Sequence, residues 1–320
     1  MRKKLFCLLL GLAIVYIAPT TVFAAHMLIP VGRVVGLELH NNTVTVAAVE
    51  DDSAALSAGI QVGDRILSID DRAICSAEDV RLALDQSQGS IHMTLQRSGE
   101  LTSVRIEPAI TPNGPKLGIY LRQGVTGIGT ITYYDPAAQT FAALGHGVNE
   151  PSGQLLRLTT GNIYTARIAS VRKGTPGEPG QLIGALCAKD PLGTLNRNTS
   201  QGVFGKARLP WKAQPLPVGE AQSVKTGNAT ILSTVTGDSP QEYSVEILKL
   251  YPASRQNGRN MLIRITDPEL LSITGGIVQG MSGSPLVQDG KLIGAVTHVL
   301  VNDPTMGYAI FIENMLEAAG

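Results

Sequence analysis

The chain has 320 residues, with 26 basic and 26 acidic side chains and a formal net charge of zero. This length accommodates two domains of ordinary size, and a hydrophobic content of 43% excludes a wholly disordered chain. Because no block of lysine and arginine interrupts the neutral balance, we expect no nucleic-acid partner. The 35 glycines and 18 prolines favour many short strands joined by tight turns.

Residues 1–25 have the pattern of a signal peptide or an N-terminal membrane anchor. Residues 2–4 are Arg-Lys-Lys, an uncharged apolar run follows over 5–18, and residues 22–24 offer a cleavage site. The uncharged stretch 5–25 is also just long enough to span a bilayer. Both alternatives predict that the bulk of the chain is exported across the cytoplasmic membrane.

Residues 27–108 have the pattern of a small domain with strands around one helix. Residues 43–47 and 91–96 alternate with period two, and Ser76 is placed to cap a helix that reaches Ser87. The segment 53–70 (Ser-Ala-Ala-Leu-Ser-Ala-Gly-Ile-Gln-Val-Gly-Asp-Arg-Ile-Leu-Ser-Ile-Asp) resembles the central signature of PDZ domains from exported bacterial proteases. The resemblance implies a peptide-binding module over residues 27–108.

In PDZ domains a peptide adds as an extra strand beside the strand that follows a carboxylate-binding loop. By element order, the resemblance puts this loop at Val35, Gly36 and Leu37 and the edge strand at 37–39. Residues 78–86 would form the opposite wall of the groove. The alternative is a spacer domain whose groove is closed.

From residue 116 to residue 320, short apolar runs separated by Gly, Pro and Asn predict an all-β barrel or sandwich. One helix is expected, at 312–318. The strands are expected at 127–134, 164–171, 182–187, 229–235, 242–251 and 261–265. The predicted fold class is therefore mainly β.

The segment 280–285 (Gly-Met-Ser-Gly-Ser-Pro) resembles the G-x-S-G-[GS]-P nucleophile loop of chymotrypsin-fold serine peptidases. Its small residues let the backbone curl so that the N–H groups of Gly280 and Ser282 can form an oxyanion hole. Ser282 would attack the carbonyl carbon of the substrate. Taken alone the hexamer is weak evidence, because turns rich in glycine and serine are common.

A serine hydroxyl needs a base within hydrogen-bond reach, and a third group must orient that base. His146 lies between two glycines at the end of an apolar run and is the candidate base, with a turn histidine as the alternative. Asp190 and Asp267 compete for the third position, and spacing alone favours Asp190. Because each aspartate precedes a proline, each has the alternative of capping a turn.

His298 follows Ser282 by 16 residues, near where related folds build the pocket for the residue before the cleaved bond. A packed histidine is preferred here over a group that selects acidic substrates. Cys75 and Cys187 are too few for a disulfide framework, and the five histidines include no H-x-x-x-H pair. No metal and no cofactor are predicted.

Longer runs extend the resemblance to most of the chain. The segments 127–135, 143–147, 174–178, 280–285 and 294–305 look like the SpoIVB peptidase family, exported sporulation serine peptidases with a hydrophobic N-terminus, a PDZ domain and a catalytic domain. The resemblance implies a chymotrypsin-like double β-barrel over residues 116–320. It also implies His146 as the base, Ser282 as the nucleophile and Asp267, rather than Asp190, as the acid.

The same resemblance implies signalling during spore formation, in the space between the mother-cell and forespore membranes. The exported enzyme would cleave a membrane-bound regulator and so trigger the intramembrane proteolysis that activates a late sigma factor. Self-cleavage is implied as well, near residues 25–40, with the PDZ groove holding the N-terminal part of the chain. The main rival is a catalytically inactive PDZ adaptor, and an esterase on the same fold is a lesser one.

Overall fold

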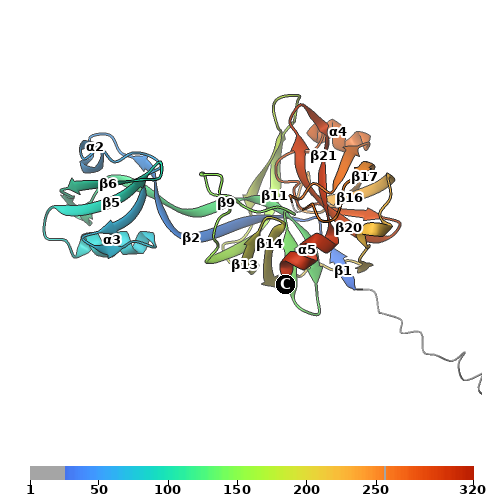
Figure 1. The fold of residues 1–320 in the computed structure, drawn as a ribbon, viewed down its shortest axis with the longest axis horizontal. Coiled ribbons are helices and arrows are strands. Elements are labelled where there is room, and N and C mark those ends of the chain that lie inside the picture. The colour runs from blue at the N-terminus through green and yellow to red at the C-terminus, as the bar shows by residue number, and fades with distance from the viewer. Residues whose placement is uncertain (1–25, 256) are drawn as a thin grey trace, which may run out of the picture.

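The computed structural model describes residues 26–255 and 257–320, which form two β-barrels and a PDZ domain (Figure 1). The PDZ domain lies at the far end of a long two-stranded ribbon made by β2 (Val34–Val49) and β9 (Ile119–Asp135). The predicted targeting segment 1–25 lies outside the described residues. Within the described ranges, no helix has the length and hydropathy needed to cross a membrane.

The first barrel is a closed ring of strands that begins and ends at the β2–β9 ribbon. Apolar side chains alternate along β2, so that Val35, Leu37 and Leu39 enter the core of this barrel. β1 (Met27–Pro30) pairs with β9 outside the ring, β15 (Leu216–Pro217) pairs with β1, and β12 (Gln181–Leu186) pairs with β11 (Thr160–Arg172). Around the ring the order is β2, β9, β10 (Thr140–Ala143), β14 (Gly202–Ala207), β13 (Gly193–Thr199) and β11 (Thr160–Arg172).

The second barrel is closed by strands from the C-terminal part of the chain. Helix α4 (Pro268–Thr274) follows β18 (Met261–Ile265), a short 3₁₀ helix at Ala221–Ser223 precedes β16 (Gly227–Ser233), and helix α5 (Ile312–Ala319) is the last element. The order around this barrel is β16 (Gly227–Ser233), β17 (Gln241–Leu250), β18 (Met261–Ile265), β21 (Asp303–Phe311), β20 (Lys291–Leu300) and β19 (Pro285–Gln288).

The two barrels share a hydrophobic cluster beneath α5. Tyr133 and Phe204 come from strands of the first barrel, whereas Leu292 and Ile310 come from the second, and Met315 of α5 packs among them. This cluster holds the barrels in contact. The predicted mainly β fold, with a PDZ domain and a double barrel, is confirmed, and so is the C-terminal helix.

The PDZ domain has its own hydrophobic core, separate from both barrels. Ser76 caps α3 (Ala77–Asp85) as predicted. Its side chain accepts a hydrogen bond from the Asp79 amide, while the Asp79 carboxylate accepts one from the Ser76 amide. The remaining elements are α2 (Ala54–Ser57), β3 (Arg65–Ile69), β4 (Arg72–Ala73), α3 (Ala77–Asp85), β5 (Ile91–Arg97), β6 (Glu100–Ile106), β7 (Ala109–Thr111) and β8 (Gly114–Lys116).

The boundaries of the PDZ domain differ from the prediction of 27–108. Residues 27–39 belong to the first barrel, where they pair with β9, β11 and β15. Residues 119–123 of β9 complete the PDZ domain by pairing with residues 44–49 of β2. The domain is therefore an insertion between two strands of the first barrel. A strand with alternating apolar residues has the same sequence pattern in a barrel as in a PDZ domain, so the pattern alone did not separate the two domains.

The ribbon bends where it leaves the barrel. Its register shifts between Leu39 and Val44, and Gly124 opposite this shift has φ of +83°. A Cβ atom at Gly124 would lie 1.8 Å from the Leu39 carbonyl oxygen, so only glycine fits this close approach. Asn41, which is buried at the bend, donates a hydrogen bond to Glu150 of the first barrel.

Candidate active site

The predicted carboxylate-binding loop at Val35, Gly36 and Leu37 is wrong, because these residues lie in the middle of β2. Each of them faces one residue of β9 on one side and one residue of β11 on the other. A strand paired along both edges has no free backbone groups for an added peptide strand. The loop was assigned from the order of elements on the assumption that this strand is the first strand of the PDZ domain. The strand belongs to the first barrel, so the prediction failed.

The free edge of the PDZ sheet is instead the first part of β9. Ile119, Tyr120 and Leu121 pair with β2 along one edge, and in the described chain no strand covers the other edge, which faces α3. The predicted groove wall at 78–86 thus corresponds to α3. Gly118 precedes this edge with φ of +78°. Gly118 lies between Leu117 and Ile119 at the start of β9, and a glycine between two apolar residues at the start of a strand is the local pattern that could have indicated the loop before this edge.

Ser282, His146 and Gly280 line one pocket of about 320 Å³ at the junction of the barrels. The serine loop lies between α4 and β19 of the second barrel, and His146 follows β10 of the first barrel. The apolar wall of the pocket comes from the ribbon, through Leu37 and Leu39 of β2 together with Val125, Gly127 and Ile128 of β9. The structure therefore brings the predicted nucleophile, base and oxyanion loop together.

The amides of the serine loop have the pattern that an oxyanion hole requires. Met281 N–H donates within the loop over 3.1 Å, and Gly283 N–H donates to the Val296 carbonyl over 2.7 Å. The N–H groups of Gly280 and Ser282 make no hydrogen bond to any part of the chain that the structure describes. These two donors remain available to an anionic oxygen next to Ser282.

His146 is half-buried, and burial lowers the pKa of its imidazole below the ordinary 6.5, although a hydrogen bond to Gly147 works the other way. Its Nδ1 atom lies 2.9 Å from the carbonyl oxygen of Gly147. Because a carbonyl accepts and does not donate, Nδ1 carries the hydrogen and Nε2 of the neutral ring is left as the acceptor. This tautomer suits a general base that acts through Nε2.

The hydroxyl of Ser282 donates to the Thr297 carbonyl over 2.8 Å rather than to His146. Its proton is therefore held by the backbone in this conformation. This contact could not be predicted from the residue types, since every residue has a backbone carbonyl.

His298 packs beside His146, with ring centroids 5.4 Å apart. Its Nδ1 atom is buried without a hydrogen-bond partner in the described chain. Burial, together with His146 and Arg259, lowers the pKa of His298 to about 4. His298 is thus a packed, neutral imidazole at pH 7, as the preferred sequence interpretation had it.

The structure does not bring either aspartate to His146. Asp267 begins α4, where its carboxylate accepts hydrogen bonds from the amides of Glu269 and Leu270 and from the Ser244 amide. Asp190 is exposed. Neither lines the pocket, and the group that orients His146 in this conformation is the Gly147 carbonyl.

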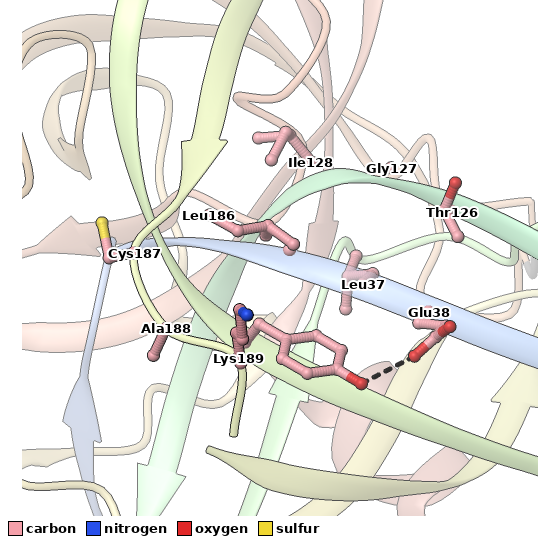
Figure 2. A pocket seen from close by; sticks show the side chains of 11 residues that line it. Leu37, Glu38, Thr126, Gly127, Ile128, Leu186, Cys187, Ala188 and Lys189 are labelled. Carbon is pink, nitrogen blue, oxygen red and sulfur yellow. Dashed lines mark hydrogen bonds between the residues drawn. The ribbon is translucent and has the colours of Figure 1, made fainter. Parts of the chain in front are cut away.

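A larger pocket of about 650 Å³ adjoins the serine pocket and shares Leu37, Gly127 and Ile128 with it. Figure 2 shows its opposite side, formed by the segment from Leu186 to Lys189. The Tyr164 hydroxyl donates to Glu38 at one end over 2.7 Å. No local pattern in the sequence indicates this pocket, because its walls come from β2, β9, β11 and the end of β12 with the segment that follows it, which only the fold brings together.

Cys75 and Cys187 are exposed and free. Within residues 26–255 and 257–320, no group of three or more His, Cys, Asp or Glu side chains gathers in a geometry that could hold a metal ion.

Comparison with known proteins assigns the family. Residues 113–316 match the sequence model of the SpoIVB peptidase S55 family, and residues 45–97 match a PDZ domain. The chain belongs to the SpoIVB peptidase S55 family. The SpoIVB match includes β9 and all of the second barrel, and the structure adds β2 to the ring of the first barrel and β1 beside β9, outside the ring.

Curated relatives cover a smaller part of this SpoIVB-family chain. "Putative zinc metalloprotease Atu1380" of Agrobacterium fabrum is 29% identical over 152 residues, which is 44% of this chain and 39% of that protein. "Putative zinc metalloprotease R01501" of Rhizobium meliloti is 31% identical over 162 residues, 47% of this chain and 42% of that protein. The chain thus spans about two fifths of the length of these relatives.

Two kinds of solved structure are similar to parts of the chain. The PDZ domain of the SdrC-like protein from Listeria monocytogenes is 25% identical, with a TM-score of 0.23, and the match covers 25% of this chain and 87% of that chain. The Rv3671c protease of Mycobacterium tuberculosis, in its inactive form, is 16% identical with a TM-score of 0.36, and the match covers 60% of this chain and 82% of that chain.

Proposed function

We propose that this SpoIVB-family protein is an exported serine endopeptidase with Ser282 as nucleophile and His146 as general base. One observation carries the proposal: Ser282 and His146 line the same pocket, and the two amides without partners, those of Gly280 and Ser282, belong to the same loop. Family membership supports the same activity.

The reaction begins when Ser282 Oγ turns from the Thr297 carbonyl toward Nε2 of His146. The imidazole takes the hydroxyl proton as Oγ attacks the peptide carbonyl carbon, and it later gives that proton to the leaving amine. The oxygen that becomes negative accepts hydrogen bonds from the Gly280 and Ser282 amides. A donor of this kind is typically worth about 3 kcal/mol of transition-state stabilisation.

The PDZ domain is proposed to hold a peptide along the free edge of β9 at residues 119–121, opposite α3. Backbone hydrogen bonds to this edge would supply affinity, and side-chain pockets beside α3 would supply selectivity. Because β9 continues from this edge into the wall of the serine pocket, one strand connects peptide capture with cleavage.

The biological role that fits these parts is sporulation signalling, carried out between the mother-cell and forespore membranes. The substrate would be a membrane-associated regulatory protein whose cleavage triggers intramembrane proteolytic activation of a late sigma factor. The protein's own N-terminal region is a second proposed substrate. N-terminal sequencing of fragments released by wild-type protein, but not by the Ser282→Ala variant, would identify both cleavage sites.

Labelling with a fluorophosphonate tests the activity itself. We expect the wild-type protein to be labelled and both Ser282→Ala and His146→Ala to lose labelling. Ser284→Ala is the matched control, because Ser284 lies two residues away in the same loop but its hydroxyl is buried against Ser233. If wild-type protein and Ser282→Ala label equally little, the protein is an adaptor rather than a peptidase.

A further inference from the structure

The serine loop depends on a residue of the opposite barrel. Gly280 has φ of +100° and Gly283 has φ of +96°, so both ends of the loop have the backbone conformation that glycine adopts most readily. Glycine has no side chain that packs and fixes its torsions. The direction of the free Gly280 and Ser282 amides must therefore be set by hydrogen bonds to the neighbouring peptide groups.

Thr130 of β9 makes hydrogen bonds to both sides of this loop. Its hydroxyl donates to the Gly280 carbonyl over 2.7 Å, and its backbone N–H donates to the Ser282 carbonyl over 3.2 Å. The two carbonyls belong to the peptide groups that directly follow the two oxyanion amides in the chain. Holding these carbonyls fixes the plane of each peptide group next to an oxyanion donor.

The same residue also reaches the turn that carries the base. The Thr130 carbonyl accepts a hydrogen bond from the Leu144 amide over 3.2 Å, two residues before His146. Leu144 has φ of +71°, an uncommon conformation for a leucine that this bond helps to hold. Thr130 thus touches the nucleophile loop through two bonds and the histidine turn through a third.

Thr130 packs tightly against the serine loop. A Cβ atom at Gly283 would lie 2.1 Å from the Thr130 carbonyl oxygen and 2.6 Å from the Leu144 amide nitrogen. Thr130 itself is fully buried. The second glycine of the loop motif is therefore needed to let β9 approach, and this approach brings the Thr130 hydroxyl within reach of Gly280.

We propose that Thr130 is a positioning residue for the oxyanion hole, acting through its hydroxyl on the Gly280 peptide. Thr130 is fully buried and cannot reach the substrate, and its backbone hydrogen bonds do not involve its side chain. The role of the hydroxyl is therefore separable from the packing of the strand. The inference rests on the proposed serine peptidase activity.

The chain offers a matched control for the loss of a buried threonine hydroxyl. Thr132 lies two residues along the same strand and is equally buried, but its hydroxyl has no hydrogen-bond partner in the described chain. Thr130→Val and Thr132→Val replace a hydroxyl by a methyl group in the same strand. Only the first substitution removes a contact to the serine loop.

The experiment uses p-nitrophenyl acetate as a small acyl probe, with the fluorophosphonate labelling rate as a second readout. We expect Thr130→Val to lower kcat by about 10- to 100-fold, less than the loss of a whole oxyanion donor, with little change in KM. Thr130→Ser should restore most of the activity, and Thr132→Val should match the wild type. If Thr130→Val does not fold, Thr130→Ser against Thr130→Ala isolates the hydroxyl in the same way.

Three results would overturn the role of Thr130: full activity in Thr130→Val, equal loss in Thr132→Val, or no difference between Thr130→Ser and Thr130→Ala. A wild-type protein that reacts with neither probe would instead overturn the peptidase proposal itself and this inference with it. The state of the wild-type protein thus distinguishes the two failures.

Discussion

At the scale of single residues, the site is organised by backbone groups as much as by side chains. His146 is oriented by the Gly147 carbonyl, and the Ser282 hydroxyl is held by the Thr297 carbonyl. The first contact is to the adjacent residue and the second is to a residue of β20. Neither depends on the type of the accepting residue, because the acceptor is a backbone carbonyl. Side-chain identity decides the chemistry at Ser282 and His146, while the fold decides where each proton is held.

The two partly buried imidazoles, His146 and His298, predict how the protein responds to acid. Burial lowers the pKa of His146, so the fall in acylation rate on acidification should be centred below pH 6.5. His298 has a pKa of about 4 when folded, against 6.5 in an unfolded chain. The unfolded chain takes up a proton first, so stability is present above pH 6.5 and is lost as the pH falls toward 4.

Two measurements check this response. The pH profile of p-nitrophenyl acetate acylation reports His146, and a midpoint above pH 6.5 would contradict its lowered pKa. The melting temperature between pH 7 and pH 4.5 reports His298. His298→Gln, which does not titrate in this range, should lose less stability over that interval than the wild-type protein.

At the scale of elements, Asp267 stabilises the start of α4 by accepting amide hydrogen bonds. Asp267→Ala should therefore destabilise the protein by about 1 kcal/mol, whereas Asp267→Asn should keep the cap and most of the stability. Because Asp267 does not line the serine pocket, Asp267→Asn should be labelled by the fluorophosphonate at a rate within about tenfold of the wild type. Replacing the orienting acid of a catalytic triad would instead lower the rate about 10⁴-fold.

Exposed Asp190 provides the comparison for this test. Asp190→Asn should match the wild type in both melting temperature and labelling rate. A loss of several orders of magnitude in Asp267→Asn, with an unchanged melting temperature, would instead establish Asp267 as the orienting acid that the family resemblance implies and would require α4 to move toward His146.

At the scale of the whole molecule, the insertion of the PDZ domain into the first barrel determines how it can be removed. Deleting residues 30–108 would remove β2 and open the barrel, so any loss of activity would be uninformative. Joining Thr43 directly to Gly124 removes the PDZ domain and leaves a short hairpin loop. The separate core of the PDZ domain permits this excision.

We expect the excised protein to keep the fluorophosphonate labelling rate within about threefold of the wild type, since the serine loop and His146 lie wholly within the barrels. Cleavage of the protein's own N-terminal region should change, because the proposed peptide edge is gone. A folded but unreactive product would show that the PDZ domain is needed to form the serine site. Unchanged self-cleavage would refute its role in substrate capture.

The sequence by itself determined the chemistry and the class of fold. The Gly-x-Ser-Gly loop, the histidine between two glycines and the run of short alternating strands are local patterns, and local patterns are what periodicity and turn residues encode. These patterns made Ser282, His146 and Gly280 candidates, the family resemblance assigned their roles, and the structure brings them to one pocket. The abundance of glycine reflects both the turns and the close approaches around the site.

Only the tertiary structure decided which strands belong to which domain and what surrounds the catalytic groups. Residues 34–39 and 44–49 alternate alike, and pairing partners far along the chain put the first in a barrel and the second in the PDZ domain. The hydrogen bond from the Ser244 amide to Asp267 and the contacts of Thr130 likewise join strands far apart in sequence. Such pairings follow from the packing of the whole chain, which no local pattern contains.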